Sequence, residues 1–316
     1  MDYRPLGQSG LRTAPIIFGG NVLGWTLDDR RSFDMLDACL DAGLNTIDTA
    51  DVYSRWVPEH TGGESETVLG QYFKARGNRN RFVLATKVGM DLGNGKKGLS
   101  KNYIIAAVED SLRRLQTDYI DLYQSHIDDE DTALEETLEA YERLIEQGKV
   151  RAIGASNYQG ERLEQALELA ETSDLPRYQT LQPCYNLYER AEFERNLAPV
   201  CRQRQIAVIP YFALASGFLT GKYHSHEEIR GTARERMLDK YFNDRGMAIL
   251  AALDEVSQAN GSSPATVALA WLMSRPGVTA PIASATSTSQ LKQLMAATTL
   301  RLDQAALARL ERASAY

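Results

Sequence analysis

Short apolar runs alternate with amphipathic stretches along most of the chain. Many of the runs are rich in β-branched residues and bounded by turn-forming residues, which favours buried strands. Eight such strands are expected, at residues 16–18, 45–49, 81–87, 119–123, 150–156, 180–182, 206–210 and 278–282. Apolar positions spaced three and four apart predict helices over 29–42, 64–75, 134–145, 159–171 and 192–204, and a further helix N-capped by Ser100. Gly148 is expected to end the helix over 134–145.

Strands that alternate with helices indicate parallel pairing through crossover units. Eight repeats of this kind are typical of an α/β fold, the closed (β/α)8 TIM barrel. An open doubly wound sheet is the alternative, but it usually carries a G-x-G-x-x-G turn after its first strand. Here the first strand runs into Phe18-Gly19-Gly20-Asn21. The barrel is therefore the preferred prediction.

Two segments exceed a minimal barrel. Tyr3–Thr13 contains Gly7-Gln8-Ser9-Gly10 and predicts an N-terminal β-hairpin, and the charged segment Lys222–Arg245 predicts a long loop after strand 7. The length of 316 residues would fit about two domains of roughly 150 residues each. No low-complexity linker divides the chain, so a single domain over residues 1–316 is expected.

Composition narrows the classes of partner. Hydrophobic residues make up 43% and charged residues 24%, which is ordinary for a globular protein. A net charge of −7 argues against a nucleic-acid partner. We expect a cytoplasmic protein without a membrane partner, because the sequence shows no signal peptide and no run of about 18 apolar residues. Cys39, Cys184 and Cys201 match no metal motif, so reduced thiols and no metal site are expected. The composition leaves open whether the protein is a monomer or a homo-oligomer.

Four polar side chains lie at or just after predicted strand ends. Asp48 and Lys87 stand at strand ends, His126 follows one, and Tyr53 lies in a loop. In a barrel these groups would face one mouth. A lysine ammonium stabilises tyrosinate and lowers the pKa of a tyrosine, and a neutral histidine can orient a carbonyl oxygen. Each residue alone has an ordinary explanation, but their joint placement predicts a site that protonates an oxygen as negative charge develops on it.

Sequence blocks around these residues resemble the aldo-keto reductases. Asn45–Ser54 resembles the first signature of that family, and residues 85–87 and 121–126 resemble the strands with its lysine and histidine. Residues 148–157, Gln182 with 185–186, and residues 209–222 are similar to three later blocks, in family order. The long insertion is most similar to the microbial branch that includes the potassium-channel β subunits.

The resemblance implies a TIM barrel that binds NADP(H) without a Rossmann domain and reduces aldehydes or ketones. Its tetrad would be Asp48, Tyr53, Lys87 and His126. Tyr53 would be the general acid in reduction, Lys87 paired with Asp48 would lower the pKa of Tyr53, and His126 would orient the carbonyl. Motif matches imply further cofactor contacts, namely the carboxamide ligands Ser156, Asn157 and Gln182, the stacking Tyr211, and the pyrophosphate loop residues Leu214, Gly217, Leu219 and Lys222.

The adenosine end departs from the family pattern. Thr286 stands where many relatives have an arginine that grips the 2′-phosphate, and Leu294 replaces an asparagine. Hydroxyls of Ser284 and Thr286, with Gln290, are the remaining phosphate ligands, so NADP(H) is expected and NAD(H) stays possible.

Trp25 and Trp56 are expected to line the substrate pocket. Two other functions stay open: a nicotinamide-binding regulatory module like the channel β subunits, and a Schiff-base lyase with Lys87 as nucleophile.

Overall fold

A computed structural model describes residues 1–93, 95–232 and 234–316. Its main sheet holds eight parallel strands in the order β10-β3-β4-β5-β6-β7-β8-β9. The strand bounds are β3 Ile17–Gly19, β4 Thr46–Asp48, β5 Val83–Val88, β6 Ile120–Ser125, β7 Val150–Ser156, β8 Thr180–Gln182, β9 Ala207–Val208 and β10 Ile282–Ala283. Each strand pairs with its sequence neighbour, as a barrel wound by repeated crossover units requires.

Backbone hydrogen bonds join the two end strands of this sheet. Val208 of β9 forms a parallel bridge with Val278, and the amide of Thr279 donates to the carbonyl of Val208 over 2.8 Å. The amide of Ile282 donates to the carbonyl of Pro210 over 2.9 Å. The strand predicted over 278–282 is thus irregular, and regular pairing is confined to its C-terminal end. The sheet closes on itself, which confirms the (β/α)8 fold class.

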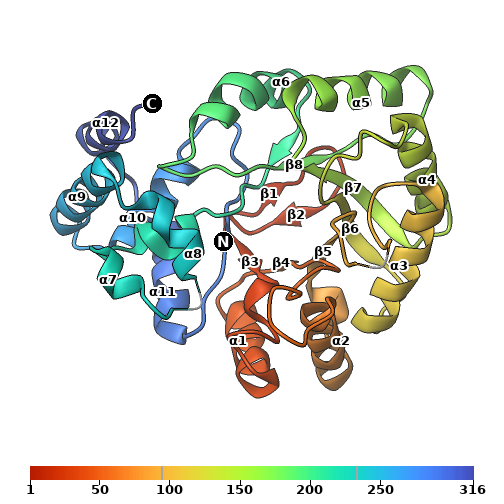
Figure 1. Ribbon diagram of the computed structural model, residues 1–316, viewed down its shortest axis with the longest axis horizontal. Helices are drawn as coiled ribbons and strands as arrows, with labels where there is room; N and C mark the ends of the chain where they lie inside the picture. The colour runs from red at the N-terminus through yellow and green to blue at the C-terminus, as the bar shows by residue number, and fades with distance from the viewer. Residues whose placement is uncertain (94, 233) are drawn as a thin grey trace.

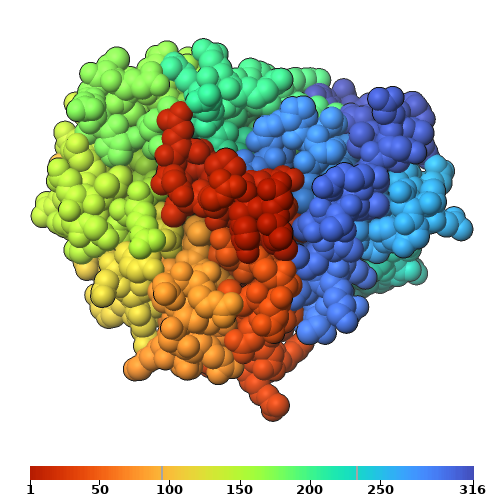
Figure 2. Space-filling view, turned by 180° about the vertical axis from the view of Figure 1, so that it is seen from behind, coloured from red at the N-terminus to blue at the C-terminus, as the bar shows by residue number. Residues whose placement is uncertain are grey.

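The predicted N-terminal hairpin is present as β1 (Arg4–Pro5) and β2 (Arg12–Thr13), paired antiparallel. Leu6 of its turn packs with inward-facing strand residues that include Ile17, Leu122 and Ile282. Figure 2 shows the hairpin across the centre of the face turned away from the viewer of Figure 1. Leu6 therefore helps to fill the N-terminal end of the barrel, and the opposite, C-terminal end is the mouth where barrel enzymes place their chemistry.

Helices surround the sheet and bury a second, larger core against its outer face (Figure 1). They are α1 Asp29–Asp41, α2 Glu64–Arg76, α3 Lys101–Leu115, α4 Leu134–Glu146, α5 Gly160–Thr172, α6 Ala198–Gln203, α9 Asp244–Ala259, α10 Pro264–Met273, α11 Thr288–Ala297 and α12 Gln304–Ala313. Within the described ranges, no helix has both the length and the apolar character needed to cross a membrane.

Three local details refine the predicted helices. Gly148 follows the end of α4 with φ 69°, the left-handed conformation that favours glycine. Ser100 occupies the N-cap position of α3, but its side chain makes no capping hydrogen bond, so only its backbone serves as the cap. The helix predicted over 192–204 is already helical at Ala191, passes through a π-helical turn at Phe193–Leu197 and continues as α6. Pro199, which lacks a backbone N–H, stands at this transition.

The predicted long loop after strand 7 is confirmed. It follows β9 and contains the 3-10 segment η4 (Ala215–Thr220), the short helices α7 (His226–Ile229) and α8 (Glu235–Leu238), and η5 (Asp239–Tyr241). Position 233, inside the charged insertion, lies outside the described residues. Because the loop leaves the C-terminal end of β9, it borders the mouth of the barrel.

Candidate active site

The ammonium of Lys87 lies at the centre of the predicted tetrad. Its Nζ donates to Oδ2 of Asp48 over 2.7 Å, to the hydroxyl of Tyr53 over 3.1 Å and to the carbonyl of Thr49 over 2.8 Å. Asp48 is the last residue of β4, and Lys87 lies in the neighbouring strand β5. A lysine ammonium has three N–H donors, and all three have partners here. Two adjacent strands and the loop after β4 therefore bring these three residues into direct contact.

The Lys87–Asp48 pair is almost completely shielded from solvent, with 0% and 2% of the residues exposed. Burial alone lowers the pKa of Lys87, but the charge of Asp48 and the contact with Tyr53 outweigh it, so the pKa is raised. The ammonium therefore stays protonated at neutral pH. A Schiff-base reaction needs a neutral amine, so this environment disfavours the lyase hypothesis for Lys87.

The environment of Tyr53 differs from the expectation. Loss of solvent around its hydroxyl raises the pKa, the charge of Lys87 lowers it, and the charge of Asp48 raises it again. Lys87 lowers the pKa of Tyr53, as the sequence predicted, but the net direction is upward. Burial and the carboxylate of Asp48 together outweigh the effect of the lysine. Tyr53 accordingly holds its proton at neutral pH, with Lys87 acting against a still larger rise.

His126 completes the set at the end of β6. Its ring meets that of Tyr53 edge to face, with ring centroids 5.9 Å apart. Burial and the charge of Lys87 lower the pKa of His126 well below its ordinary value, so the ring is neutral. Its Nδ1 is buried without a hydrogen-bond partner among the described residues. The structure thus brings all four predicted residues together around one proton-bearing hydroxyl.

The four residues predicted to contact a nicotinamide ring form one network beside the tetrad. Tyr211 donates to Oδ1 of Asn157 over 2.8 Å, and Nδ2 of Asn157 donates to the carbonyl of His126 over 2.9 Å. Ser156 donates to the carbonyl of Gln182 over 2.9 Å, and Gln182 lies at the end of β8. Amide and hydroxyl groups of this kind suit recognition of a carboxamide.

The loop after β9 contains the residues that were predicted to contact a pyrophosphate. Ser216 and Gly217 both have left-handed backbone conformations, with φ of 58° and 103°. The amide of Gly217 donates to the carbonyl of Leu214 over 2.8 Å, so this N–H group is used within the turn itself. The hydroxyl of Ser216 is buried without a partner among the described residues, and a Cβ placed on Gly217 would lie 4.0 Å from Nζ of Lys222. A hydroxyl and an ammonium are both groups that can donate hydrogen bonds to a phosphate.

Leu214 and Leu219, the two leucines predicted in the pyrophosphate loop, differ in burial. Leu214 is partly buried at the edge of the outer core, and Leu219 is fully buried in it. The side chain of Leu219 is therefore unavailable to a ligand, and any contact from this residue must come from its backbone.

At the predicted adenosine end, side chains are tied to one another. Oε1 of Gln290 accepts from the amide of Thr286 over 2.7 Å and from its hydroxyl over 3.1 Å. Ser284 donates to the carbonyl of Gly19 over 2.8 Å. Arg31, exposed at the start of α1, reaches the carbonyl of Thr286 over 3.4 Å. Sequence reasoning missed Arg31, because only the closure of the barrel brings α1 next to the β10–α11 loop.

Aromatic rings continue outward from Tyr53. Its ring centroid lies 5.6 Å from that of Trp56, and Trp56 lies 5.4 Å from Trp25. Trp56 is 49% exposed, so the two predicted wall residues form an accessible aromatic surface.

The guanidinium of Arg234 lies 5.6 Å from the Trp25 ring and donates to the carbonyl of Ser216 over 3.2 Å. Burial lowers the pKa of Arg234. Sequence reasoning gave this arginine no role, since nothing in the charged insertion distinguishes it.

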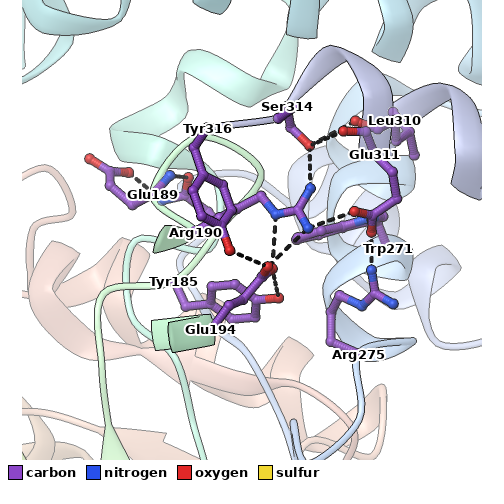
Figure 3. Close-up of polar contacts among 12 residues, drawn as sticks. Tyr185, Glu189, Arg190, Glu194, Trp271, Arg275, Leu310, Glu311, Ser314 and Tyr316 are labelled. Carbon is purple, nitrogen blue, oxygen red and sulfur yellow. Dashed lines mark hydrogen bonds and ion pairs between the residues drawn. The ribbon is translucent and has the colours of Figure 1, made fainter. Parts of the chain in front are cut away.

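Tyr185 belongs to a network of hydrogen bonds and ion pairs centred on Arg190 (Figure 3). Tyr185 donates to Glu194 over 2.8 Å, and Arg190 contacts the same carboxylate over 2.8 Å. Arg190 also pairs with Glu311 over 2.6 Å and donates to Ser314 over 2.8 Å. The network ties the segment after β8 to the C-terminal helix α12. Tyr185 therefore has a structural role. Of the predicted block formed by Gln182 and residues 185–186, Gln182 is the residue that contacts the tetrad, through Asp48.

Comparisons with known proteins show the family of the chain. The model of the aldo/keto reductase family matches residues 15–315. The chain is 33% identical to Aldo-keto reductase YhdN of Bacillus subtilis over 93% of this chain and 88% of the relative. It is 31% identical to Protein tas of Escherichia coli over 98% and 97%, and 31% identical to a probable voltage-gated potassium channel subunit beta of Arabidopsis thaliana over 94% and 91%. The chain belongs to the aldo/keto reductase family.

Proposed function

We propose that this protein is an NADP(H)-dependent oxidoreductase that reduces aldehydes or ketones to alcohols. The observation that carries the proposal is the position of Lys87, whose buried ammonium contacts both Asp48 and the hydroxyl of Tyr53 at the mouth of the barrel. A neutral, buried histidine beside that hydroxyl supports the same reaction. Membership of the aldo/keto reductase family supports oxidoreductase chemistry.

The residues present fit a nicotinamide dinucleotide. When bound, such a cofactor supplies the hydride. Ser156, Asn157 and Gln182 would hold its carboxamide and Tyr211 would face its ring, because these groups form one network beside the tetrad. Lys222 would meet the pyrophosphate, together with the left-handed turn at Ser216 and Gly217. Arg234, which donates to the carbonyl of Ser216, is a further cation beside that turn.

The proton that completes the alcohol would come from Tyr53. Its raised pKa keeps the hydroxyl protonated until a carbonyl oxygen gains negative charge. Lys87 then stabilises the tyrosinate that forms, because its ammonium already contacts the oxygen. Neutral His126 would orient the carbonyl oxygen towards Tyr53. Trp25 and Trp56 would cover the apolar part of the substrate and exclude water.

NADP(H) is preferred over NAD(H), although Thr286 offers no charge to a 2′-phosphate. Arg31, in contact with Thr286, supports this preference because it brings a guanidinium to the same loop. Comparing kcat/KM for NADPH and NADH tests the choice. We expect a ratio above one, and a ratio below one contradicts it.

A carbonyl panel assayed by NADPH oxidation tests the reaction itself. The panel should include methylglyoxal, aromatic aldehydes and sugar aldehydes. Tyr53→Phe should lose at least about 100-fold in kcat while cofactor affinity stays near that of the wild type. Near-normal kcat in this variant would contradict the mechanism.

A nicotinamide-binding regulatory module is the second candidate. The similarity to plant proteins described as probable channel β subunits favours it. Tight NADPH binding without turnover across the whole panel would support the module over the enzyme. The complete proton-donor set around Tyr53 makes turnover the expected result.

A further inference from the structure

A second amide reaches the carboxylate of Asp48. Oδ2 of Asp48 is taken by Lys87, and Oδ1 accepts from Nε2 of Gln182 over 2.8 Å and from Nε2 of Gln124 over 3.3 Å. Gln124 lies in β6 and is completely buried. Nothing in the proposed reaction so far uses Gln124, yet it contacts the residue that holds Lys87.

The barrel wall leaves a slot for this side chain. Gln124 pairs with Lys87 on β5 and with Gly154 on β7, and Gly154 pairs with Thr180 on β8. A Cβ at position 154 would lie 2.2 Å from Oγ1 of Thr180 and 3.0 Å from Cγ of Gln124. No side chain larger than hydrogen fits there while both neighbours keep their places. Glycine at this point is what allows Gln124 to lie along the inside of the wall.

The slot also orients the amide. The hydroxyl of Thr180 lies 3.5 Å from Oε1 of Gln124, in position to donate a weak hydrogen bond. The carboxylate of Asp48 can only accept, so it assigns the NH2 group of Gln124 to Asp48, and the amide oxygen faces the hydroxyl of Thr180. Among the described residues, Asp48 is the acceptor that the NH2 group of Gln124 reaches.

We propose that Gln124 is a positioning residue that holds Asp48 against Lys87 and thereby sets the acid strength of Tyr53. The inference rests on the proposed function, because it assigns Gln124 to the same proton transfer. An amide donor stabilises a buried carboxylate without adding a charge to the site. Gln182 makes a similar bond but is also a predicted carboxamide ligand. Gln124, enclosed by Gly154 and Thr180, serves Asp48 whether or not a cofactor is bound.

The direction of the effect follows from the charges. The carboxylate of Asp48 raises the pKa of Tyr53. The N–H dipole of Gln124 points at that carboxylate and offsets part of its charge. Without this dipole, more of the negative charge acts on Tyr53, so the tyrosine becomes a weaker acid. Reduction should then slow, because the proton leaves Tyr53 less readily.

The test compares Gln124→Met, which keeps the length of the side chain but removes the donor, with Thr180→Val, which removes only the orienting hydroxyl. For Gln124→Met we expect kcat for reduction to fall about tenfold and the alkaline limb of its pH profile to rise by about 0.5–1 pH unit. KM and the Kd for NADPH should stay unchanged, since Gln182 is intact. Thr180→Val should move the alkaline limb of the pH profile upward by a smaller amount. This second variant still tests the proposal if Gln124→Met does not fold.

Asn78→Leu is the matched control for loss of a buried amide. Asn78 donates to the hydroxyl of Tyr72 over 3.1 Å, away from the tetrad. This variant should lower Tm and leave the pH profile in place. If Gln124→Met behaves in the same way, Gln124 is only structural and the inference is wrong.

A readout without turnover separates this inference from the proposed function. Titration of ¹³Cζ-labelled tyrosine by NMR, with Tyr53 assigned by the signal lost in Tyr53→Phe, reports the acid strength of Tyr53 directly. An upward shift in Gln124→Met supports the inference even if no carbonyl is reduced. Identical Tyr53 titrations in the wild type and Gln124→Met overturn it. Absence of carbonyl reduction, by contrast, overturns only the proposed function.

Discussion

Nε2 of Gln182 donates a hydrogen bond to Oδ1 of Asp48 over 2.8 Å, across 134 positions of sequence. The bond connects a predicted cofactor ligand at the end of β8 with the carboxylate that holds Lys87. Recognition of the carboxamide and stabilisation of the proton donor therefore share one side chain. Perturbing either end of this bond should affect both functions.

Gln182→Met should show that coupling. Loss of the amide removes a carboxamide ligand and a donor to Asp48, so cofactor affinity should fall about tenfold and kcat should fall with it. Quenching of tryptophan fluorescence by NADPH measures the Kd, and steady-state kinetics measure kcat. Gln124→Met is the matched comparison, since it should lower kcat at unchanged Kd. Equal cofactor affinity in Gln182→Met and the wild type would remove Gln182 from the cofactor site.

Breaking the buried ion pair should be costly. Lys87→Met leaves the carboxylate of Asp48 buried without its cation, and Asp48→Asn leaves the ammonium without its anion. Each single change should lower the free energy of unfolding by about 3–5 kcal/mol. The double variant should lose clearly less than the sum, because it leaves no unpaired charge. Urea unfolding of the four proteins measures the cycle, and strict additivity would contradict a direct pair.

The neutral state of His126 should make stability depend on pH. Its folded pKa is depressed, so only the unfolded chain takes up a proton at this residue as the pH falls below about 6.5. The stability contribution is fully present above that value and is lost towards acid, at up to about 1.4 kcal/mol per pH unit. His126→Gln should flatten this slope between pH 7.5 and pH 5.5 in urea unfolding. An unchanged slope would show that His126 is protonated in the folded protein.

Cofactor choice should respond to the loop at Thr286. Arg31→Ala should weaken binding of 2′,5′-ADP, and Thr286→Arg should tighten it by about tenfold, since a guanidinium pairs well with phosphate. Binding of 5′-AMP, which lacks the 2′-phosphate, should be unaffected. Arg30→Ala is the matched control, because Arg30 is an exposed neighbour in the same helix. Calorimetry measures all of these affinities, and equal effects of Arg30→Ala and Arg31→Ala would rule out a specific contact.

Local pattern was enough to predict the parallel α/β order, the hairpin and the long loop after strand 7. Strand and helix periodicities are local properties, and repeated crossovers leave few topologies open. The sequence did not predict details that depend on the hydrogen bonds of single groups. Ser100 caps α3 without its side chain, and the strand predicted over 278–282 is regular only at its C-terminal end.

Motifs likewise predicted Asp48, Tyr53, Lys87 and His126, because each stands at or just after a strand end. The sequence could not predict the net shift of the Tyr53 pKa, which depends on burial and on the distance to two opposite charges. It also could not predict the contacts of Gln124, Arg31 and Arg234, since these depend on which strands and loops meet when the sheet closes. The sequence by itself determined the order of the elements and the chemical groups at the mouth. Only the tertiary structure decided which of those groups touch, because hydrogen bonds and charge interactions act over a few ångströms between residues far apart in the chain.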